Sequence, residues 1–288
     1  MSSHNVSLSE HIEQMDKHQD QTYIGDGVNE ETGEKFKYAM ITDGHGRHDC
    51  IRVLRSITKA DLSTMLGKKN PVETLAGYVK SRMHPTRPYG SGATLCFTKI
   101  FEDRIECVNV GDSQFAVFKD GELLHLSTEH TWENAKDKER LLATDPFLFF
   151  EPSKTIKVIS KTKMISAYTE YAVWADGNRL ACTQALGHGS RTGFAPDTIS
   201  IPLEKGSTYK VIIGSDGIWD MVIKDDPEDI KRFSTMNGNE IVESISSRWL
   251  QEWDMAPSET STEVEKGRYQ RHECDDISLV VADILPIE

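Results

Sequence analysis

Short apolar runs separated by turn residues recur along most of the chain and predict β-strands more often than helices. The strands predicted in this way cover residues 21–24, 35–42, 93–101, 104–110, 114–119, 123–127, 209–213 and 277–284. We expect residues 145–200 to alternate short strands with turns. Residues 1–20 are expected to form either an edge strand or a short helix.

Helical periodicity marks fewer segments. Asn70, followed by Pro71 and Glu73, is typical of a helix start with a capping box. Apolar residues spaced four apart, ending at Trp253, give the clearest amphipathic helix. The predicted helices cover residues 48–66, a segment from Asn70, 131–142, a segment from Asp226, and 240–253. The polar residues 254–272 are expected to form a loop.

Strands interspersed with helices, without regular strand–helix alternation, predict an α+β fold in which two antiparallel β-sheets pack together beneath covering helices. With 288 residues, of which 38% are hydrophobic, the chain can bury a sizeable core. No repeat or internal linker interrupts the pattern, so we expect residues 1–288 to form a single domain.

The formal charge of −13 argues against binding to nucleic acid or anionic membranes, because both need a basic surface. No apolar run approaches the ~18 residues that span a bilayer, and the first residues lack a signal-peptide core. Cys96, Cys107 and Cys182 lie within apolar runs, which favours buried free thiols over metal ligands. We expect a soluble intracellular protein, cytoplasmic or nuclear, and a monomer.

Aspartates stand at the ends of several predicted strands. Asp43 follows one strand and is itself followed by Gly44, His45 and Gly46, Asp112 and Asp216 follow two others, and Asp275 precedes the last. Each alone is an ordinary turn residue. Because the end of one antiparallel strand lies beside the start of its neighbour, we expect these acids to meet at one edge.

Converging carboxylates need a counter-charge, because two of them about 4 Å apart repel by roughly 4 kcal/mol at an effective dielectric near 20. No lysine or arginine lies within the motifs of Asp20, Asp43, Asp216 and Asp275. Oxygen ligands favour Mg²⁺ or Mn²⁺ over zinc. Two such ions would activate a water and hold a phosphoryl oxygen, while His45 protonates the leaving oxygen. The pattern therefore predicts metal-assisted phosphoester hydrolysis.

Six short motifs occur in a definite order within residues 15–284: TDGHG at 42–46, GSGAT at 90–94, GDS at 111–113, LACTQALG at 180–187, SDGIWD at 215–220 and DDIS at 275–278. Each is unspecific alone, but the ordered set resembles the PP2C (PPM) family of metal-dependent serine/threonine protein phosphatases. The resemblance implies an α-β-β-α sandwich. It also implies hydrolysis of phosphoserine and phosphothreonine in proteins by a hydroxide that bridges two Mg²⁺ or Mn²⁺ ions.

The resemblance also implies a role for each matching residue. The direct metal ligands would be Asp43, which bridges both ions, the carbonyl of Gly44, Asp216 and Asp275. Asp20 is expected to hold metal-bound waters, and Asp112 and Asp220 to take a third, weaker ion. His45 is expected to be the general acid. We expect Asp276 to stabilise the turn beside Asp275.

The chain departs from the family pattern at several positions. Met15 stands where the family has an arginine that binds the substrate phosphate, and Lys17 or His18 could substitute, with Lys17 as our candidate. Gln19 replaces a glutamate, and residues 183–188 lack one arginine and one aspartate. These departures leave two alternatives: a catalytically inactive binding or scaffold module, and a phosphoesterase acting on small molecules.

Residues 145–178 fall where the family carries a flap beside the active site. Four lysines give this stretch local positive charge, Lys154, Lys157, Lys161 and Lys163. Our hypothesis is that they dock substrate, and the alternative is a solvated strand face. His130 and His188 are expected to be structural or surface groups, and residues 90–92 to allow close backbone packing.

Overall fold

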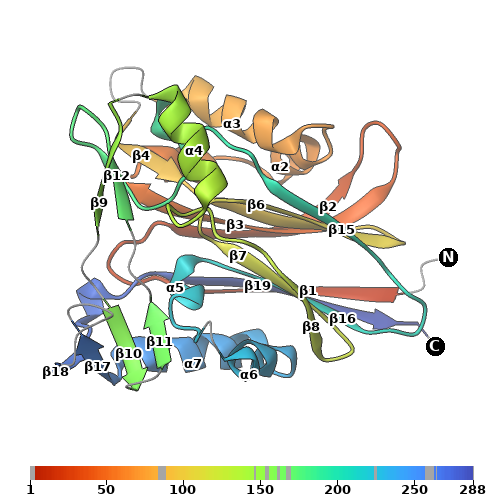
Figure 1. Cartoon of the computed structure of the whole chain (residues 1–288). Coiled ribbons are helices and arrows are strands. Elements are labelled where there is room, and N and C mark those ends of the chain that lie inside the picture. The colour runs from red at the N-terminus through yellow and green to blue at the C-terminus, as the bar shows by residue number, and fades with distance from the viewer. Residues whose placement is uncertain are drawn as a thin grey trace.

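Two large antiparallel sheets form the centre of the molecule (Figure 1). The computed structural model describes residues 4–83, 89–145, 147–152, 156–160, 163–166, 170–223, 226–256, 263 and 265–287. The five-stranded sheet has the order β1 (His4–Glu13), β19 (Ile277–Pro286), β16 (Tyr209–Gly214), β7 (Gln114–Lys119) and β8 (Glu122–Leu126). The seven-stranded sheet has the order β14 (Leu186–Gly187), β4 (Ser91–Ala93), β3 (Lys35–Gly46), β5 (Leu95–Ile100), β6 (Arg104–Val110) and β15 (Asp197–Pro202), with β2 (Asp20–Val28) also on β3.

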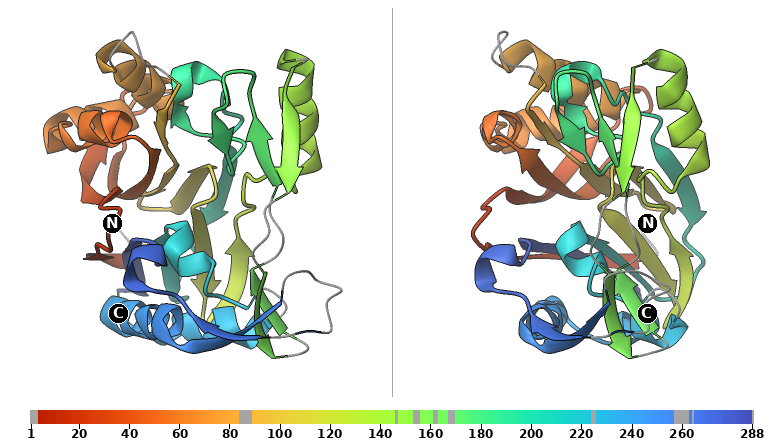
Figure 2. Two further views of the ribbon diagram at one scale, coloured as in Figure 1. Left: turned by 90° about the vertical axis from the view of Figure 1, so that its left-hand side faces the viewer. Right: turned by 60° about the vertical axis from the view of Figure 1, so that its left-hand side comes forward.

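Helices cover the outer faces of both sheets, as Figures 1 and 2 show. The seven-stranded sheet carries α1 (Asp49–Arg55), α2 (Lys59–Leu66) and α3 (Pro71–Arg82), and the five-stranded sheet carries α5 (Asp216–Trp219), α6 (Pro227–Lys231) and α7 (Gly238–Leu250). Three short 3-10 helices are η1 (His188–Ser190), η2 (Arg232–Ser234) and η3 (Arg271–Glu273). Alternating side chains such as Ile41, Val211 and Val280 fill the space between the sheets. The predicted α-β-β-α sandwich is confirmed.

Two small sheets lie at the end of the sandwich opposite the chain termini (Figure 1). The first contains β9 (Phe149–Pro152), β12 (Glu170–Val173) and β13 (Arg179–Leu180); with α4 (Ala135–Thr144) it encloses the buried Trp132 and Trp174. The second contains β10 (Ile156–Ser160), β11 (Lys163–Ser166), β17 (Glu252–Ala256) and β18 (Glu265–Arg268). The predicted flap thus contributes strands to both. Lys154 and Lys161 lie outside the described residues, as do the side chains of Lys157 and Lys163.

Several predicted boundaries are wrong for local reasons. The helix over 48–66 is two helices, because Thr58 accepts a hydrogen bond from the backbone N–H of Asp61 and caps a new start. Asn70 precedes α3 as predicted, but its side chain makes no cap hydrogen bond, so the predicted capping box is absent there. A capping box instead starts α7, between Asn237 and Glu240.

The C-terminal segment also differs from the prediction. Helix α7 ends at Leu250, and the buried Trp253 belongs to β17, where its indole N–H donates to the carbonyl of Arg248. Residues 254–272 are not a loop throughout, since they include most of β17 and all of β18. The first residues form the edge strand β1, one of the two alternatives. No helix in the described ranges is long and apolar enough to cross a membrane.

Candidate active site

The aspartates predicted to converge do meet at one end of the sandwich. Asp20 lies opposite Asp43 in the register of β2 and β3. Asp216 begins α5 directly after β16, and Asp275 lies just before β19, which pairs with β16. A cavity of about 330 Å³ is lined by Asp43, Asp112, Asp216 and Asp275. Antiparallel pairing brings Asp20 beside Asp43 in one sheet and the ends of β16 and β19 together in the other. The packing of the two sheets then gathers acids that are more than 200 residues apart in the chain.

Burial and mutual repulsion disfavour the charged forms of these carboxyl groups. Burial, followed by the charges of Asp216, Asp20 and Asp275, raises the pKa of Asp43 well above its ordinary value. Burial and then the charge of Asp275 do the same to the pKa of Asp216. Burial is also the main cause that raises the pKa of Asp20 and of Asp112 to about 7. The cavity is therefore a site where added positive charge is strongly favourable.

The donor set fits hard divalent ions. Oδ1 of Asp216 and Oδ2 of Asp20 are buried and find no hydrogen-bond partner among the residues described. Within the same residues no three acidic, histidine or cysteine side chains form a complete metal site. Mg²⁺ and similar ions keep several waters and take few protein carboxylates. The orphaned carboxylate oxygens are the observation on which this fit depends.

Gly44 and Asp276 shape the backbone around these acids. A Cβ at Gly44 would lie 3.0 Å from the carbonyl oxygen of Gln19, so the close approach of these strands requires a glycine. The carboxylate of Asp276 accepts from the backbone N–H groups of Met15, at 2.6 Å, and Gln19, at 2.7 Å. Asp276 thus fixes the loop between β1 and β2, a segment more than 250 residues from the turn beside Asp275 that it was predicted to stabilise.

That loop places Lys17, and not Met15, at the cavity. Met15 is 1% exposed and packs in the core beneath α7. Nζ of Lys17 donates to Oδ2 of Asp275 at 2.5 Å, and the Lys17 side chain lines the cavity. The structure therefore puts one ammonium group beside the acids, close to the position where the resemblance expects an arginine.

Two imidazoles, those of His45 and His188, also line the cavity and form what we call its imidazole wall, the carboxylates forming its acidic wall. His45, at the end of β3, stacks on His188 with ring centroids 4.7 Å apart and an interplanar angle of 15°. Burial is the main cause that lowers the pKa of His45 to about 3, with contributions from His188 and Lys17. His188 was expected to be structural or at the surface; it is 2% exposed and lines the cavity. The repeated Gly-His-Gly pattern at 44–46 and 187–189 could have indicated this pairing.

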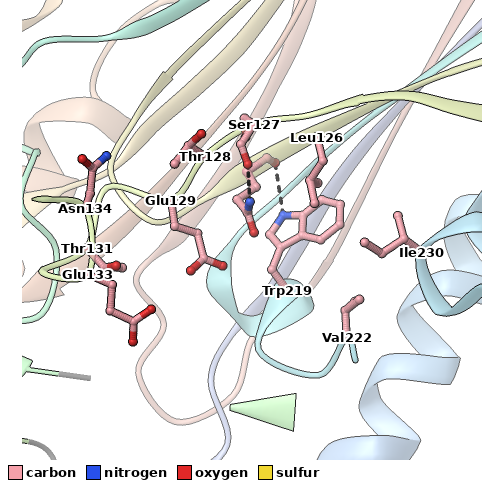
Figure 3. A pocket seen from close by; sticks show the side chains of 11 residues that line it. Leu126, Ser127, Thr128, Glu129, Thr131, Glu133, Asn134, Trp219, Val222 and Ile230 are labelled. Atoms are coloured by element: carbon pink, nitrogen blue, oxygen red, sulfur yellow. Dashed lines mark hydrogen bonds between the residues drawn. The ribbon is translucent and has the colours of Figure 1, made fainter. Parts of the chain in front are cut away.

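The remaining acids extend the negative charge toward a second cavity. Asp220 ends α5, and after burial the charges of Glu129 and Asp220 contribute to the raised pKa of Asp112. Glu129 was not predicted. It lines a neighbouring cavity of about 310 Å³ whose buried floor is Trp219 (Figure 3). The indole N–H of Trp219 donates to the carbonyls of Gln114, at 3.1 Å, and Gly214, at 2.9 Å, so the last residue of α5 is tied to β7 and β16.

Comparison with known proteins identifies a family for the chain. The family described as "Protein phosphatase 2C" matches residues 8–252. A probable protein phosphatase 2C 11 of Arabidopsis thaliana is 20% identical over 269 residues, which cover 90% of this chain and 61% of that protein. The protein phosphatase 2C homolog 2 of Saccharomyces cerevisiae is 25% identical over 196 residues, 68% of this chain and 38% of that protein. The chain thus spans less than two thirds of either relative.

Solved structures show the same fold. The catalytic domain of the serine/threonine protein phosphatase PstP, in complex with two manganese ions, superposes with a TM-score of 0.54 at 17% identity, covering 98% of this chain and 99% of that chain. The phosphatase MsPP from Mycobacterium smegmatis, in complex with cacodylate, gives a TM-score of 0.54 at 18% identity, with 96% and 97% covered. These likenesses establish the architecture.

Proposed function

Because the chain belongs to the protein phosphatase 2C family, we propose that it hydrolyses phosphoserine and phosphothreonine esters in proteins, with Mg²⁺ or Mn²⁺ at the acidic cavity. The observation that carries this proposal is the gathering of Asp43, Asp216 and Asp275 around one cavity with an orphaned carboxylate oxygen. An acyl or glycosyl transfer mechanism would give these crowded acids no counter-charge, whereas phosphoryl transfer by divalent ions does.

Different acids would serve different ions. The groups that would hold two ions are Asp43, the carbonyl of Gly44, Asp216 and Asp275. Asp20 lies opposite Asp43 in the register of β2 and β3 and would receive hydrogen bonds from ordered water. Asp112 and Asp220 would take a third ion. When bound, the ions polarise the phosphoryl group and lower the pKa of water.

Lys17 and His45 would act directly on the substrate. Lys17 reaches the cavity with a side chain that is 47% exposed, so its ammonium group can turn from Asp275 toward a phosphate oxygen. His45 is neutral at pH 7 and carries one N–H, which it would donate to the departing serine or threonine oxygen. A water oxygen forms the new P–O bond as the ester P–O bond breaks. His45 gives its proton to the departing oxygen, and the proton that the attacking water loses restores His45, so the products are the alcohol and inorganic phosphate.

The test is hydrolysis of a phosphothreonine peptide in the presence of Mn²⁺, with wild type and Asp216→Asn compared. We expect Asp216→Asn to lower turnover by about 1,000-fold or more, because a neutral amide would replace a carboxylate that we propose to bind the metal ions. Asp103→Asn is the control, since Asp103 lies on the opposite end of the sandwich beside Arg104. Equal rates for wild type and Asp216→Asn would show that the mechanism is wrong.

A second candidate is a binding module without catalysis. The burial of Met15 favours it, because no arginine stands where the family binds phosphate. Hydrolysis of p-nitrophenyl phosphate with Mn²⁺, with and without chelator, separates the two candidates. A parallel comparison of phosphopeptide with nucleotide substrates tests the small-molecule alternative.

A further inference from the structure

Among the residues that the structure describes, His188 is the one imidazole at the cavity to which the proposed chemistry gives no task. It begins η1, it is 2% exposed, and its ring lies flat against that of His45 at 4.7 Å. Sγ of Cys182 lies 3.7 Å from Nε2 of His45. The His45 ring is therefore held between a stacked imidazole and a thiol.

The hydrogen bond of His188 fixes its tautomer. Nδ1 lies 2.8 Å from the carbonyl oxygen of Tyr89, and because a carbonyl only accepts, Nδ1 carries the hydrogen. Burial lowers the pKa of His188, so the ring is neutral and Nε2 keeps a lone pair. That Nε2 is buried and has no hydrogen-bond partner in the described part of the chain. An orphaned ring nitrogen at a cavity wall is a costly feature that calls for a reason.

The backbone is shaped to admit both rings. A Cβ at Gly92 would lie 2.2 Å from Nε2 of His188 and 2.8 Å from Nε2 of His45, so both nitrogens face the same glycine. The predicted close packing of backbone at residues 90–92 is found instead at Gly90, whose carbonyl oxygen would lie 2.5 Å from a Cβ at Gly46. His188 itself has φ of 47° and Ser190 has φ of 66°, and a left-handed conformation costs a non-glycine residue about 1 kcal/mol or more. The chain thus holds His188 in a strained conformation against His45.

We propose that His188 is a positioning residue for His45: its stacked, hydrogen-bonded ring holds the His45 ring in the one orientation that presents N–H to the departing oxygen. The inference rests on the proposed function, in which His45 donates that proton. His188 exchanges no proton itself. The proton moves from His45 to the serine or threonine oxygen as the P–O bond breaks, and His188 acts only by restricting the rotation of the donor.

The leaving group distinguishes this role from a merely structural one. A serine or threonine alkoxide needs a proton to depart, whereas p-nitrophenolate departs without one. We expect His188→Ala to lower kcat on a phosphothreonine peptide by about 10-fold to 100-fold and to change kcat on p-nitrophenyl phosphate less than about 3-fold. His45→Ala should show the same split, and His45→Ala/His188→Ala should be no worse than His45→Ala alone.

Two further variants complete the experiment. His188→Phe keeps a ring against His45 and should restore most of the peptide activity. His125→Ala is the matched control, because His125 also stacks on an aromatic ring, that of Phe115 at 5.5 Å, but lies away from the cavity. If His188→Ala does not fold, His188→Gln carries the test, because it keeps an N–H for Tyr89 while it removes the ring.

The outcomes separate the two proposals. Equal losses on both substrates, an unchanged peptide rate, or additive effects in the double variant would overturn the positioning role while the phosphatase proposal stands. A wild-type protein that hydrolyses neither substrate with Mn²⁺ would overturn the proposed function, and the positioning role with it.

Discussion

The acidic wall and the imidazole wall of the cavity experience the same burial with opposite results. Burial raises the pKa of Asp216 and lowers the pKa of His45, because in each case it disfavours the charged form. The carboxylates also repel one another, whereas neutral imidazoles stack without repulsion. The acidic wall therefore favours positive charge beyond that of Lys17, whereas the imidazole wall is completed by the chain's own neutral rings.

Of the variants compared, Asp43→Asn should have the largest effect on activity, because it removes a carboxylate from the acidic wall. We expect loss of turnover on a phosphothreonine peptide by about 1,000-fold or more, equivalent to about 4 kcal/mol, because this residue would contact both ions. Mn²⁺ should raise the melting temperature of wild type but not of this variant. Asp26→Asn is the control, since Asp26 pairs with Lys37 on the surface. A variant that binds Mn²⁺ as tightly as wild type would remove Asp43 from the ligand set.

The free energy of unfolding, measured against pH in the presence of chelator, should show the effect of burial on the acidic wall. The pKa of Asp20 is about 7 in the folded protein and 3.8 ordinarily, so between these values the folded state binds a proton that the unfolded chain does not. Stability should therefore fall as pH rises from about 4 to 7, by on the order of 1 kcal/mol per pH unit for this group. Asp20→Asn should flatten the profile measured by urea unfolding. A profile that is equally steep in the variant would assign the effect to other acids.

Lys17→Met tests the one lysine that lines the acidic cavity in the described part of the chain. We expect kcat/KM on the phosphopeptide to fall by about 10-fold, or about 1.4 kcal/mol, because a charged contact to the phosphate is lost. Lys37→Met is the matched control, since Lys37 also pairs with an aspartate, at 3.1 Å, but outside the cavity. An unchanged kcat/KM would mean that the phosphate is held by the ions without help from this side chain.

The two walls also differ in how far the sequence could predict them. Asp43 and Asp216 each stand at the end of a strong apolar run, which made both recognisable, although Asp43 and Gly44 lie within β3 and not in the turn that the glycines predicted. Their meeting follows from the packing of two sheets, each of which is built by antiparallel pairing. His188 follows the two-residue strand β14, which has no periodicity of its own, and its position depends on pairing with β4 almost 100 residues earlier. The pattern of residues around His188 therefore carries no information about its position beside β4.

The difference between local pattern and distant pairing also explains the errors in the predicted helices and strands. β17 forms because it pairs with β10, a partner about 100 residues away, and the polar strand β18 forms because it pairs with β17. The break between α1 and α2 depends on a single cap at Thr58, against an apolar periodicity that continues through it. Long apolar strands were predictable, whereas elements stabilised by distant partners or by one side chain were not.

The smallest expected effect concerns the imidazole wall. The change in stability with pH that it causes is opposite in sign to the change caused by the acidic wall. Burial lowers the pKa of His188, so below about pH 6.5 the unfolded chain binds a proton that the folded protein does not. This group should therefore reduce stability as pH falls, while Asp20 increases it. In an Asp20→Asn background, adding His188→Phe should lessen the loss of stability between pH 6.5 and 5, by less than about 1 kcal/mol, in urea unfolding with chelator. If the loss is unchanged, the acid sensitivity comes from other groups, and the neutral stacked state of His188 does not govern it.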